Sequence, residues 1–357
     1  MSKQQNICFF NTTKFWGGGE KWHFEAAELM SKTSNNTFFV CDGEGELAKK
    51  LTKTKISQYH ITVNNRSFLN PFKVNRLVKF YKENQIDAVI FNSPKDLKLG
   101  GKAAQKAGVS KIVYRRGIAV EVKNNKLNEQ LFRNVVTHFI FNSEATKTLL
   151  TKNFKGILEG KKTATIYNAI EFAAATESNR NNQQITIGNA GRLVEQKGQQ
   201  HLIEIAKELR KREADVQILI AGEGPLKNNL EGEIKKHNLS NQVKLLGFVS
   251  DMPSFMGQID IFVSTALWEG FGFVLAEAMV AKKPVLGFNL SSNPELIKDG
   301  ENGFLIPPES TTVFADKLML LINDKNQREQ MGQKAYNFAK ENFEKQQQFE
   351  KLEQFIA

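Results

Sequence analysis

Short apolar runs alternate with amphipathic stretches along most of the chain. In the amphipathic stretches, such as 21–30 and 71–84, apolar residues recur at helical spacing, and Pro71 opens the second of them. The runs between them are short and apolar throughout, as buried parallel strands are. In the first half they fall at 6–10, 37–40, 88–91, 111–114, 138–141 and 163–167. Strands that alternate with helices predict a parallel sheet with helices on both faces.

The same alternation restarts after residue 184. It predicts strands at 185–190, 216–221, 243–246, 261–264, 284–288 and 303–306, and helices at 198–212, 225–238, 273–281 and 311–321. Residues 169–184 include a polar run that cannot be buried, which predicts a linker. The fold class is therefore α/β, with two Rossmann-like doubly wound domains at 1–168 and 185–335. Residues 336–357 form a final charged helix.

Length and composition agree with that organisation. A chain of 357 residues is too long for one ordinary core, and its 41% hydrophobic and 24% charged residues are typical of globular proteins. No apolar run is long enough for a membrane span or a signal peptide, so a cytoplasmic protein is expected. Cys8 and Cys41 form no CxxC pair and the five histidines do not cluster, so no metal site is expected.

The net charge of +11 is concentrated in the first half of the chain. Residues 1–168 contain 28 Lys and Arg against 13 Asp and Glu, whereas residues 169–357 contain 21 against 25. A basic half of this kind suits anionic lipid, an acidic or phosphorylated saccharide, or nucleic acid. Because no nucleic-acid-binding motif accompanies the charge, we favour an anionic membrane surface or an anionic acceptor as the partner.

Residues 268–277 form the first of two candidate binding loops, between a predicted strand and a predicted helix. Gly270 and Gly272 let the backbone approach a ligand, and the helix N-terminus offers N–H groups to a diphosphate. Glu277 lies about one turn into the helix, where a carboxylate can accept both hydroxyls of a ribose, and Glu269 can face a sugar. The alternative is an ordinary turn with one capping and one solvated Glu.

Residues 191–198 form the second candidate loop, again between a strand and a helix. Arg192 and Lys197 are two cations at the place where a parallel sheet presents its ligand, and they suit the charge of a diphosphate. The alternative is two solvated surface cations. The glycine loop 221–226 permits a tight turn, but it lacks the full GxGxxG, so a nicotinamide cofactor is not expected.

These motifs together carry a resemblance to a known family. In chain order stand GRL…KG at 191–198, AGEGPL at 221–226, LGF at 246–248, EGFGFVLAE at 269–277 and PELI…NGFLI at 294–306. The series resembles the retaining GT-B glycosyltransferases of the large family that includes sucrose synthase and the phosphatidylinositol mannosyltransferases (glycosyl transferases group 1). In the first half the resemblance is limited to the glycine loop at 17–20 and to Tyr-Asn-Ala-Ile at 167–170.

The resemblance implies two domains that face each other across an active-site cleft. The nucleotide sugar would bind mainly to the C-terminal domain and the acceptor mainly to the N-terminal one, while the helix at 336–357 packs back on the N-terminal domain. No metal or other cofactor is implied, because cations and helix N-termini neutralise the diphosphate. In the mechanism usually drawn for the family, the acceptor attacks on the face that the leaving phosphate occupies, and that phosphate takes the acceptor proton.

The resemblance also assigns the site residues. The catalytic residues are the phosphate contacts Arg192 and Lys197, and Glu269, which contacts hydroxyls of the donor sugar. The other donor contacts are Glu277, at the ribose, and the backbone N–H groups of Phe271 and Gly272. The N-terminal loop approaches the donor phosphate and the acceptor through three glycines, Gly17, Gly18 and Gly19.

Two departures from the family pattern concern the site. Many members have a His after the strand at 111–114, where this chain has Arg-Arg-Gly, and a guanidinium cannot act as a general base. Arg115 and Arg116, together with Glu20, are candidate contacts for an acidic acceptor or for the donor; the alternative is a surface cation pair. Where the family often has two glycines, Ser291 and Ser292 either approach the nucleotide or only turn the loop.

We therefore expect a metal-independent retaining glycosyltransferase of polysaccharide or lipopolysaccharide biosynthesis. It would move a sugar from a nucleoside-diphosphate sugar to a lipid-linked or cell-surface saccharide acceptor, in the cytoplasm or peripherally at the inner face of the membrane. Two alternatives stay open at this point. One is a nucleotide-sugar epimerase of the same fold, and the other is a non-catalytic protein of this fold that binds a membrane or a partner.

Overall fold

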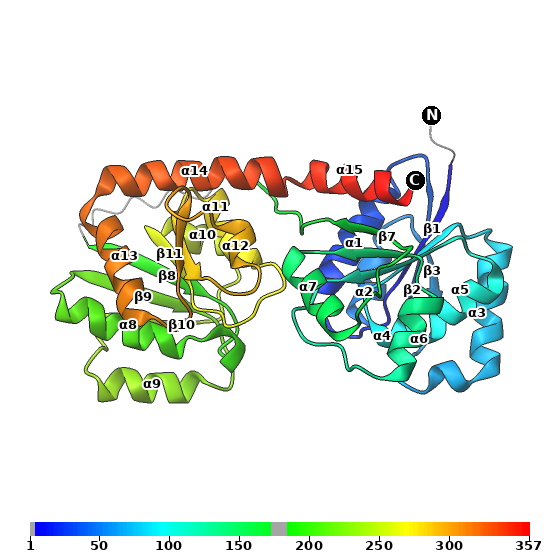
Figure 1. Ribbon diagram of the computed structural model, residues 1–357, viewed down its shortest axis with the longest axis horizontal. Coiled ribbons are helices and arrows are strands. Elements are labelled where there is room, and N and C mark those ends of the chain that lie inside the picture. Colours follow the sequence, from blue (N-terminus) through cyan, green and yellow to red (C-terminus); the bar gives the residue numbers. More distant parts are fainter. Residues whose placement is uncertain (1–3, 173–183) are drawn as a thin grey trace. The chain divides into compact units, whose positions relative to one another are not determined.

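The computed structural model describes residues 4–172 and 184–357, and the chain divides into two compact units (Figure 1). Unit 1 contains the chain up to Asn168 together with residues 346–357, and unit 2 contains residues 169–345. Most of the predicted linker, 173–183, lies outside the described residues.

Unit 1 is built on a seven-stranded parallel sheet with the order β3-β2-β1-β4-β5-β6-β7. Its strands are β1 (Asn6–Phe10), β2 (Asn36–Cys41), β3 (Ser57–His60), β4 (Ala88–Phe91), β5 (Lys111–Arg116), β6 (His138–Phe141) and β7 (Lys162–Thr165). The sequence pattern missed β3, because this edge strand is polar and half exposed rather than apolar.

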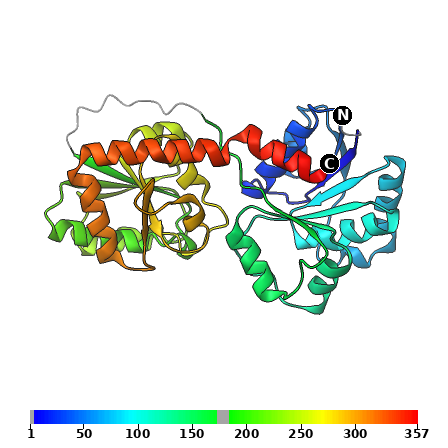
Figure 2. The ribbon, with the colours of Figure 1, turned by 45° about the horizontal axis from the view of Figure 1, so that its top comes forward.

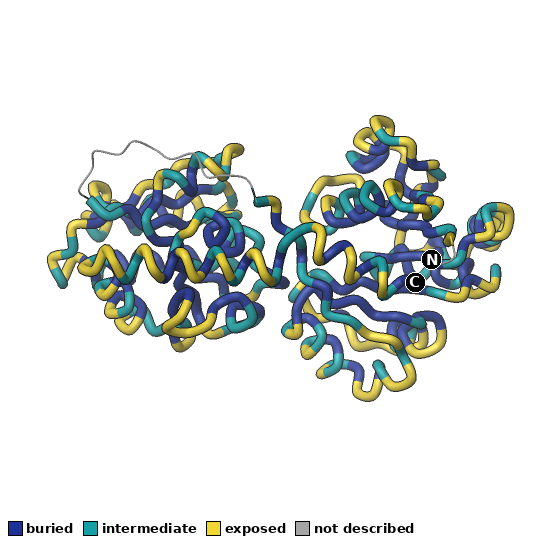
Figure 3. The backbone as a smooth tube through the Cα atoms, turned by 90° about the horizontal axis from the view of Figure 1, so that it is seen from above, coloured by how far each residue is buried: buried dark blue, intermediate teal, exposed yellow. Residues whose placement is uncertain are grey.

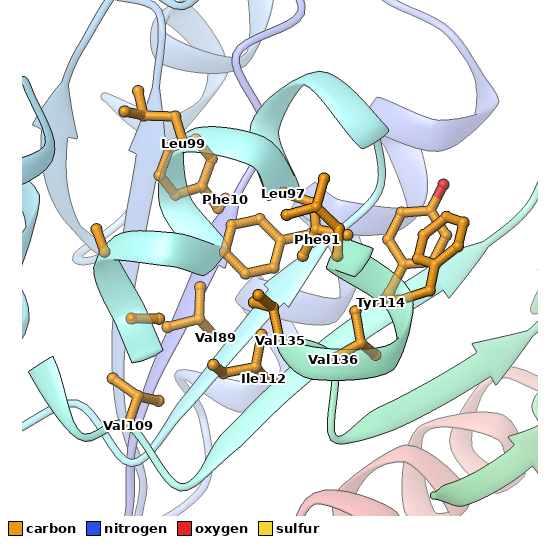
Figure 4. Close-up of a cluster of buried hydrophobic side chains, with 14 of the residues drawn as sticks. Phe10, Val89, Phe91, Leu97, Leu99, Val109, Ile112, Tyr114, Val135 and Val136 are labelled. Carbon is orange, nitrogen blue, oxygen red and sulfur yellow. The ribbon is translucent and has the colours of Figure 1, made fainter. Parts of the chain in front are cut away.

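The helices of unit 1 connect successive strands. They are α1 (Gly18–Met30), α2 (Glu46–Leu51), α3 (Pro71–Glu83), α4 (Pro94–Asp96), α5 (Lys102–Ala107), α6 (Lys126–Asn134) and α7 (Glu144–Asn153), with a 3₁₀ turn η1 (Ser67–Leu69) and a π-helical turn η2 (Leu97–Gly101). Figure 4 shows how η2 packs on the sheet through Leu97 and Leu99, against Phe10 and Phe91. A Cβ on Gly100 would lie 2.6 Å from the Phe91 ring, so only glycine allows this close approach.

A helix from the end of the chain completes unit 1. α15 (Lys345–Ile356) buries Phe349 and Leu352 in the cluster that also contains Ile7 and Phe9, and it lies beside α1 in Figure 1 and Figure 2. Lys111 Nζ donates to the carbonyl of Ala357 at 2.6 Å. The helix that reaches unit 1 therefore begins at Lys345, later than the predicted boundary at 336, which falls inside α14 (Lys325–Phe343) of unit 2.

His138 makes the stability of unit 1 depend on pH. Burial, and then the nearby Lys162 and Lys111, lowers the pKa of His138 from 6.5 to about 4. Between those values the unfolded chain binds more protons than the folded one, so stability is complete above about pH 6.5 and falls as the pH drops toward about 4. We expect the urea concentration at the unfolding midpoint to decrease as the pH is lowered through this range, and to decrease less steeply in His138→Gln. Equal slopes in both proteins would contradict this role of His138.

Unit 2 is a six-stranded parallel sheet with the order β10-β9-β8-β11-β12-β13. Its strands are β8 (Ile185–Ala190), β9 (Val216–Ala221), β10 (Val243–Gly247), β11 (Ile261–Ser264), β12 (Val285–Phe288) and β13 (Gly303–Ile306). Its helices, besides α14, are α8 (Gln200–Lys211), α9 (Lys227–Lys236), α10 (Met252–Gly257), α11 (Phe273–Val280), α12 (Asn293–Leu296) and α13 (Thr311–Asn323), and a 3₁₀ turn η3 spans Glu195–Lys197.

Both units are doubly wound, as the sequence predicted. In Figure 3 the strands of each unit are mostly buried, while the exposed segments lie on the helices and loops around them. The strand order of unit 1 reverses between β1 and β4, and that of unit 2 reverses between β8 and β11. Ligands of doubly wound sheets bind at the carboxyl ends of strands at such a reversal. The loops after β1, β4, β8 and β11 are therefore the places to look for a site.

Candidate functional site

In unit 2, the loops after β8 and β11 carry five of the six predicted site residues and are bonded to each other. Thr265 Oγ1 donates to the carbonyl of Lys197 at 3.0 Å. Leu267 N donates to the carbonyl of Gln196 at 2.9 Å, and Gln196 Nε2 donates to the carbonyl of Trp268 at 2.9 Å. Because each loop holds the backbone of the other, the two predicted binding loops form one structure.

Glycines let these loops approach so closely. Gly198 has φ +60°, and a Cβ at this position would lie 2.2 Å from the carbonyl oxygen of Thr265. In the neighbouring glycine loop, a Cβ on Gly222 would lie 1.9 Å from the carbonyl oxygen of Gly191. The glycine loop at 221–226 therefore packs directly against the loop that carries Arg192 and Lys197.

Gly198→Ala is expected to separate the two loops. The new methyl group meets backbone rather than a side chain that can move, and the left-handed conformation adds strain, so we expect a loss of about 2–4 kcal/mol in the free energy of unfolding. Urea unfolding measures it, with Gly232→Ala on α9, where the methyl group meets no neighbour within 4 Å, as the control. If Gly198→Ala is as stable as the wild type, the close contact between Gly198 and the Thr265 carbonyl is contradicted.

Lys197 and Glu269 form an ion pair between the two loops, and each side chain is 22% exposed. The backbone of Glu269 is fixed in turn by the loop after β12. Its N–H donates to Ser291 Oγ at 3.1 Å, and its carbonyl accepts from Ser291 Oγ at 2.7 Å and from Ser292 Oγ at 3.1 Å. The two serines that depart from the family pattern thus hold the Glu269 loop in place.

A small hollow opens between these loops at the carboxyl end of the sheet. Lys197, Glu269 and Gly272 line it, together with Leu275 and with Asn189 from β8. Asn189 is 4% exposed, and its Nδ2 donates to the carbonyl of Val263 at 2.8 Å, whereas its Oδ1 has no hydrogen-bond partner among the residues that the structure describes. Asn189 is not among the site residues predicted from the sequence, although a polar residue near the end of an apolar strand was a signal that could have indicated it.

The loop after β11 continues into α11 through Gly272. This glycine has φ +86° and ψ +57°, a left-handed conformation that other residues adopt at a cost, and it precedes a helix that no described side chain caps. Phe271 is buried and packs edge-on against Phe343 at 5.1 Å between ring centroids, so its side chain anchors the loop. Glu277 lies in the second turn of α11 and is half-buried. Arg192 is exposed on the loop after β8.

In unit 1, the predicted glycine loop lies at the carboxyl end of β1. Gly17 precedes α1, whose first turn has no side-chain cap from the described chain, and Gly18 opens the helix. Asn11 Nδ2 donates to Glu20 Oε1 at 3.1 Å. A Cβ on Gly19 would lie 2.3 Å from Asn92 Nδ2, so Asn92, at the end of β4, packs directly on the glycine loop. The loop thus sits at the strand reversal of its sheet.

Arg115 and Arg116 are buried, so they are not the surface cation pair of the alternative interpretation, and their contact with a donor or an acceptor stays a prediction. Arg115 is 2% exposed, and its guanidinium lies 4.1 Å from the centre of the Trp22 ring. It donates to Asn92 Oδ1 at 3.0 Å and to Asn168 Oδ1 at 2.5 Å. Arg116 is 7% exposed and donates to the carbonyl of Val120. Both guanidinium groups bond within the fold, although the buried Nε of Arg115 has no hydrogen-bond partner among the described residues. Strand β5 extends through position 116 instead of ending at 114.

Burial also affects the protonation of this cluster. It lowers the pKa of Arg115 to about 9, with Glu20 opposing the shift, so the guanidinium stays charged at neutral pH. Burial, followed by the charge of Arg115, holds the pKa of His23 well below its usual value. His23 is therefore neutral and packs between aromatic rings, as the ring contacts with Phe9 and Phe39 show.

The predicted site residues thus fall into two groups, one at the carboxyl edge of each sheet. Unit 2 brings Lys197, Glu269 and Gly272 to one hollow, while Phe271 lies on the same loop, Arg192 on the loop after β8 and Glu277 on α11. Unit 1 has Gly17, Gly18, Gly19 and Glu20 at the start of α1 and Arg115 on β5. Within the described residues, no group of three or more His, Cys, Asp or Glu side chains could hold a metal ion. In the same part of the chain, no helix combines the length and the apolar character that crossing a bilayer requires.

Comparison with known proteins connects this arrangement to a family. Residues 172–338 match the family model of glycosyl transferases group 1. The chain is 34% identical over 147 residues to an alpha-D-kanosaminyltransferase of Streptomyces kanamyceticus. The matched residues cover 41% of this chain and 38% of that protein. It is 26% identical to a poly(ribitol-phosphate) alpha-N-acetylglucosaminyltransferase of Staphylococcus aureus, over 87% of this chain and 64% of that protein.

A longer match is with an Escherichia coli UDP-Gal:alpha-D-GlcNAc-diphosphoundecaprenol alpha-1,3-galactosyltransferase, 26% identical over 86% of this chain and 85% of that protein. Among solved structures, HepE from Anabaena in complex with UDP superposes with a TM-score of 0.85 and 22% identity, over 98% of this chain and 99% of that one. The predicted likeness to glycosyl transferases group 1 and the GT-B fold are thereby confirmed, while the retaining mechanism stays a prediction. The chain spans less than two thirds of the length of the first two relatives, and the cleft between its domains stays a prediction.

Proposed function

We propose that this chain, whose residues 172–338 match glycosyl transferases group 1, is a retaining glycosyltransferase. It would move a sugar from a nucleoside-diphosphate sugar to a lipid-linked or cell-surface saccharide acceptor. The observation that carries this proposal is the Lys197–Glu269 pair, which is held between two interlocked loops at the strand reversal of unit 2. A cation and a carboxylate fixed side by side suit a ligand in which a phosphate adjoins a sugar.

Each residue of unit 2 then has a proposed role. Lys197 has three N–H donors, so it can bind Glu269 and a phosphate oxygen at the same time. Arg192 grips the diphosphate from the exposed side of its loop, and the uncapped first turn of α11 adds backbone donors. Glu269 accepts hydrogen bonds from sugar hydroxyls, and Glu277 accepts them from the ribose. These donors neutralise the diphosphate, so we propose that no metal ion is required.

The proposed reaction retains the configuration at the anomeric carbon. As the bond between that carbon and the diphosphate breaks, the acceptor oxygen bonds to the carbon on the same face, and its proton goes to the departing phosphate oxygen. Lys197 and Arg192 stabilise the negative charge on that oxygen. No protein base is then needed, which agrees with a chain that has Arg115 where many relatives have a His.

The UDP complex of the Anabaena structure and the diphosphoundecaprenol substrate of the Escherichia coli relative support the proposed classes of donor and acceptor. With a lipid-linked acceptor, the location we propose is the cytoplasm, peripherally at the inner face of the membrane. The basic first half of the chain favours contact with anionic lipid there.

Sugar transfer from UDP-, GDP- and ADP-sugars to undecaprenyl-diphosphate saccharides, in buffer with a chelator, tests the proposal. We expect one donor class to release its nucleoside diphosphate only when the acceptor is present, and a product whose anomeric configuration by NMR is that of the donor. Turnover in Glu269→Gln should fall about a hundredfold, since the charged acceptor of the sugar hydroxyls becomes a neutral amide that no longer pairs with Lys197, while the loop remains. An inverted product, or a donor that is isomerised without an acceptor, would refute the proposal.

A further inference from the structure

Strands β8 and β11 are neighbours in the sheet of unit 2 and separate before they end (Figure 1). They pair with each other only as far as Gly188 and Phe262. Beyond these residues β8 still pairs with β9 up to Ala190, and β11 still pairs with β12 up to Ser264. The two strands therefore part at the strand reversal, the place where doubly wound sheets bind their ligands.

Asn189 is the first residue of β8 beyond this pairing, and only half of its amide is used within the fold. Its Nδ2 donates to the carbonyl of Val263 and so ties β8 to β11 where their backbones no longer pair. Its Oδ1 is buried and has no hydrogen-bond partner among the residues that the structure describes. A buried acceptor without a donor costs free energy, which a donor that reaches Oδ1 would recover.

Lys197 is the only cation among the described residues that line the hollow beside Asn189. Its side chain runs along Gly191, where a Cβ would lie 3.3 Å from Lys197 Cε. The ammonium has three N–H donors, and the ion pair with Glu269 engages one of them. A diphosphate has no hydrogen to donate, so Asn189 Oδ1 cannot bind the phosphates themselves. An ammonium that binds them from the same hollow can donate to it.

We propose that Asn189 is a positioning residue for Lys197, an inference that rests on the proposed function. In the donor complex the three hydrogens of the ammonium go to a phosphate oxygen, to Glu269 and to Asn189 Oδ1. Glu269 is shared with the sugar hydroxyls there, so a second protein acceptor is needed to fix the direction of the ammonium. Because Nδ2 is held by Val263, the amide cannot turn, and Oδ1 keeps its place in the hollow.

Another buried asparagine of unit 2 shows what a purely structural amide looks like. Asn302 is 2% exposed, and both ends of its amide are bonded within the fold. Its Nδ2 donates to the carbonyl of Leu296 at 3.1 Å, and its Oδ1 accepts from the N–H of Lys298 at 2.8 Å. It directly precedes β13, at the amino edge of the parallel sheet and so at the edge opposite to the site. Asn302 is therefore a matched control for Asn189.

Two substitutions of Asn189 separate the halves of its amide in a sugar-transfer assay. Asn189→Leu removes both halves, whereas Asn189→Asp keeps an acceptor oxygen and loses the donor to Val263, so both should lower the urea midpoint. Asn189→Leu should lower kcat about tenfold, through a displaced ammonium, and leave the donor KM nearly unchanged, since the charge on the leaving oxygen develops only in the transition state. Asn189→Asp should keep most of the wild-type kcat. In Lys197→Ala, adding Asn189→Leu should lower kcat no further.

Asn302→Leu should lower the urea midpoint but keep the wild-type kcat, which shows that lost stability alone does not slow transfer. If Asn189→Leu does not fold, Asn189→Ala takes its place in every comparison. Equal losses of kcat in Asn189→Leu and Asn189→Asp would make the amide merely structural and overturn the proposal, as would an undiminished effect of Asn189→Leu in Lys197→Ala. A wild type that transfers no sugar would instead refute the proposed function and this inference with it.

Discussion

Turnover in Lys197→Ala is expected to fall about a hundred- to a thousandfold, the largest loss from any single change in unit 2. The ammonium is placed to stabilise the charge that develops on the leaving phosphate, and it also holds Glu269 by an ion pair. Removing the ammonium therefore takes away the contact to the leaving phosphate and loosens Glu269, the proposed contact to the donor sugar. Release of nucleoside diphosphate under saturating donor and acceptor measures the effect.

A matched lysine on the next helix provides the control. Lys207 pairs with Glu204 at 2.8 Å on the surface of α8, and exposed pairs of this kind contribute little to stability. Lys207→Ala should keep wild-type turnover, and both variants should unfold at nearly the wild-type urea concentration. If Lys197→Ala turns over like Lys207→Ala, the ammonium has no part in the reaction.

Arg115→Met is expected to lower the free energy of unfolding by about 3 kcal/mol. Methionine fills much of the space but leaves Asn92 Oδ1 and Asn168 Oδ1 without their donor, and it removes the cation from the face of Trp22. Arg115→Lys should lower the free energy of unfolding by less than Arg115→Met does, because one ammonium replaces only part of the guanidinium that bonds both amides. Arg133→Met, at a half-exposed ion pair with Glu129, is the control and should cost less than about 0.5 kcal/mol.

The same experiment separates two roles for Arg115. Arg115 bonds Asn92, which packs on Gly19, so a positioning role predicts that its loss lowers kcat and stability together. If Arg115 contacts the acceptor directly, Arg115→Met should raise the KM for the acceptor and leave the free energy of unfolding unchanged. That second result would support the direct contact predicted from the sequence.

The sequence predicted the architecture well because parallel strands are buried on both faces and therefore appear as short apolar runs. β3 was missed for the opposite reason, since an edge strand with the sequence Ser-Gln-Tyr-His resembles a loop. The candidate loops of unit 2 were also predictable, because glycines and cations directly after an apolar strand mark the carboxyl edge of a sheet.

Contacts between distant positions could not be read from the sequence. The side chain of Asn189 and the hydroxyls of Ser291 and Ser292 gain their places only when neighbouring strands align. The burial of Arg115 depends on Trp22 and Asn168, which are far away along the chain. An arginine pair after a strand looks like a surface feature unless the amides that receive it are known.

The most direct test of a nucleotide-sugar site in unit 2 is calorimetric titration with UDP, GDP and ADP without added metal. The wild type, Arg192→Ala and Glu277→Ala should be compared, with Lys236→Ala on the surface of α9 as the control. We predict that one nucleotide binds the wild type and the control equally, and binds each of the other two variants about tenfold or more weakly. If none of the three nucleotides binds at millimolar concentration, or if Arg192→Ala and Glu277→Ala bind like the wild type, the proposed donor site is contradicted.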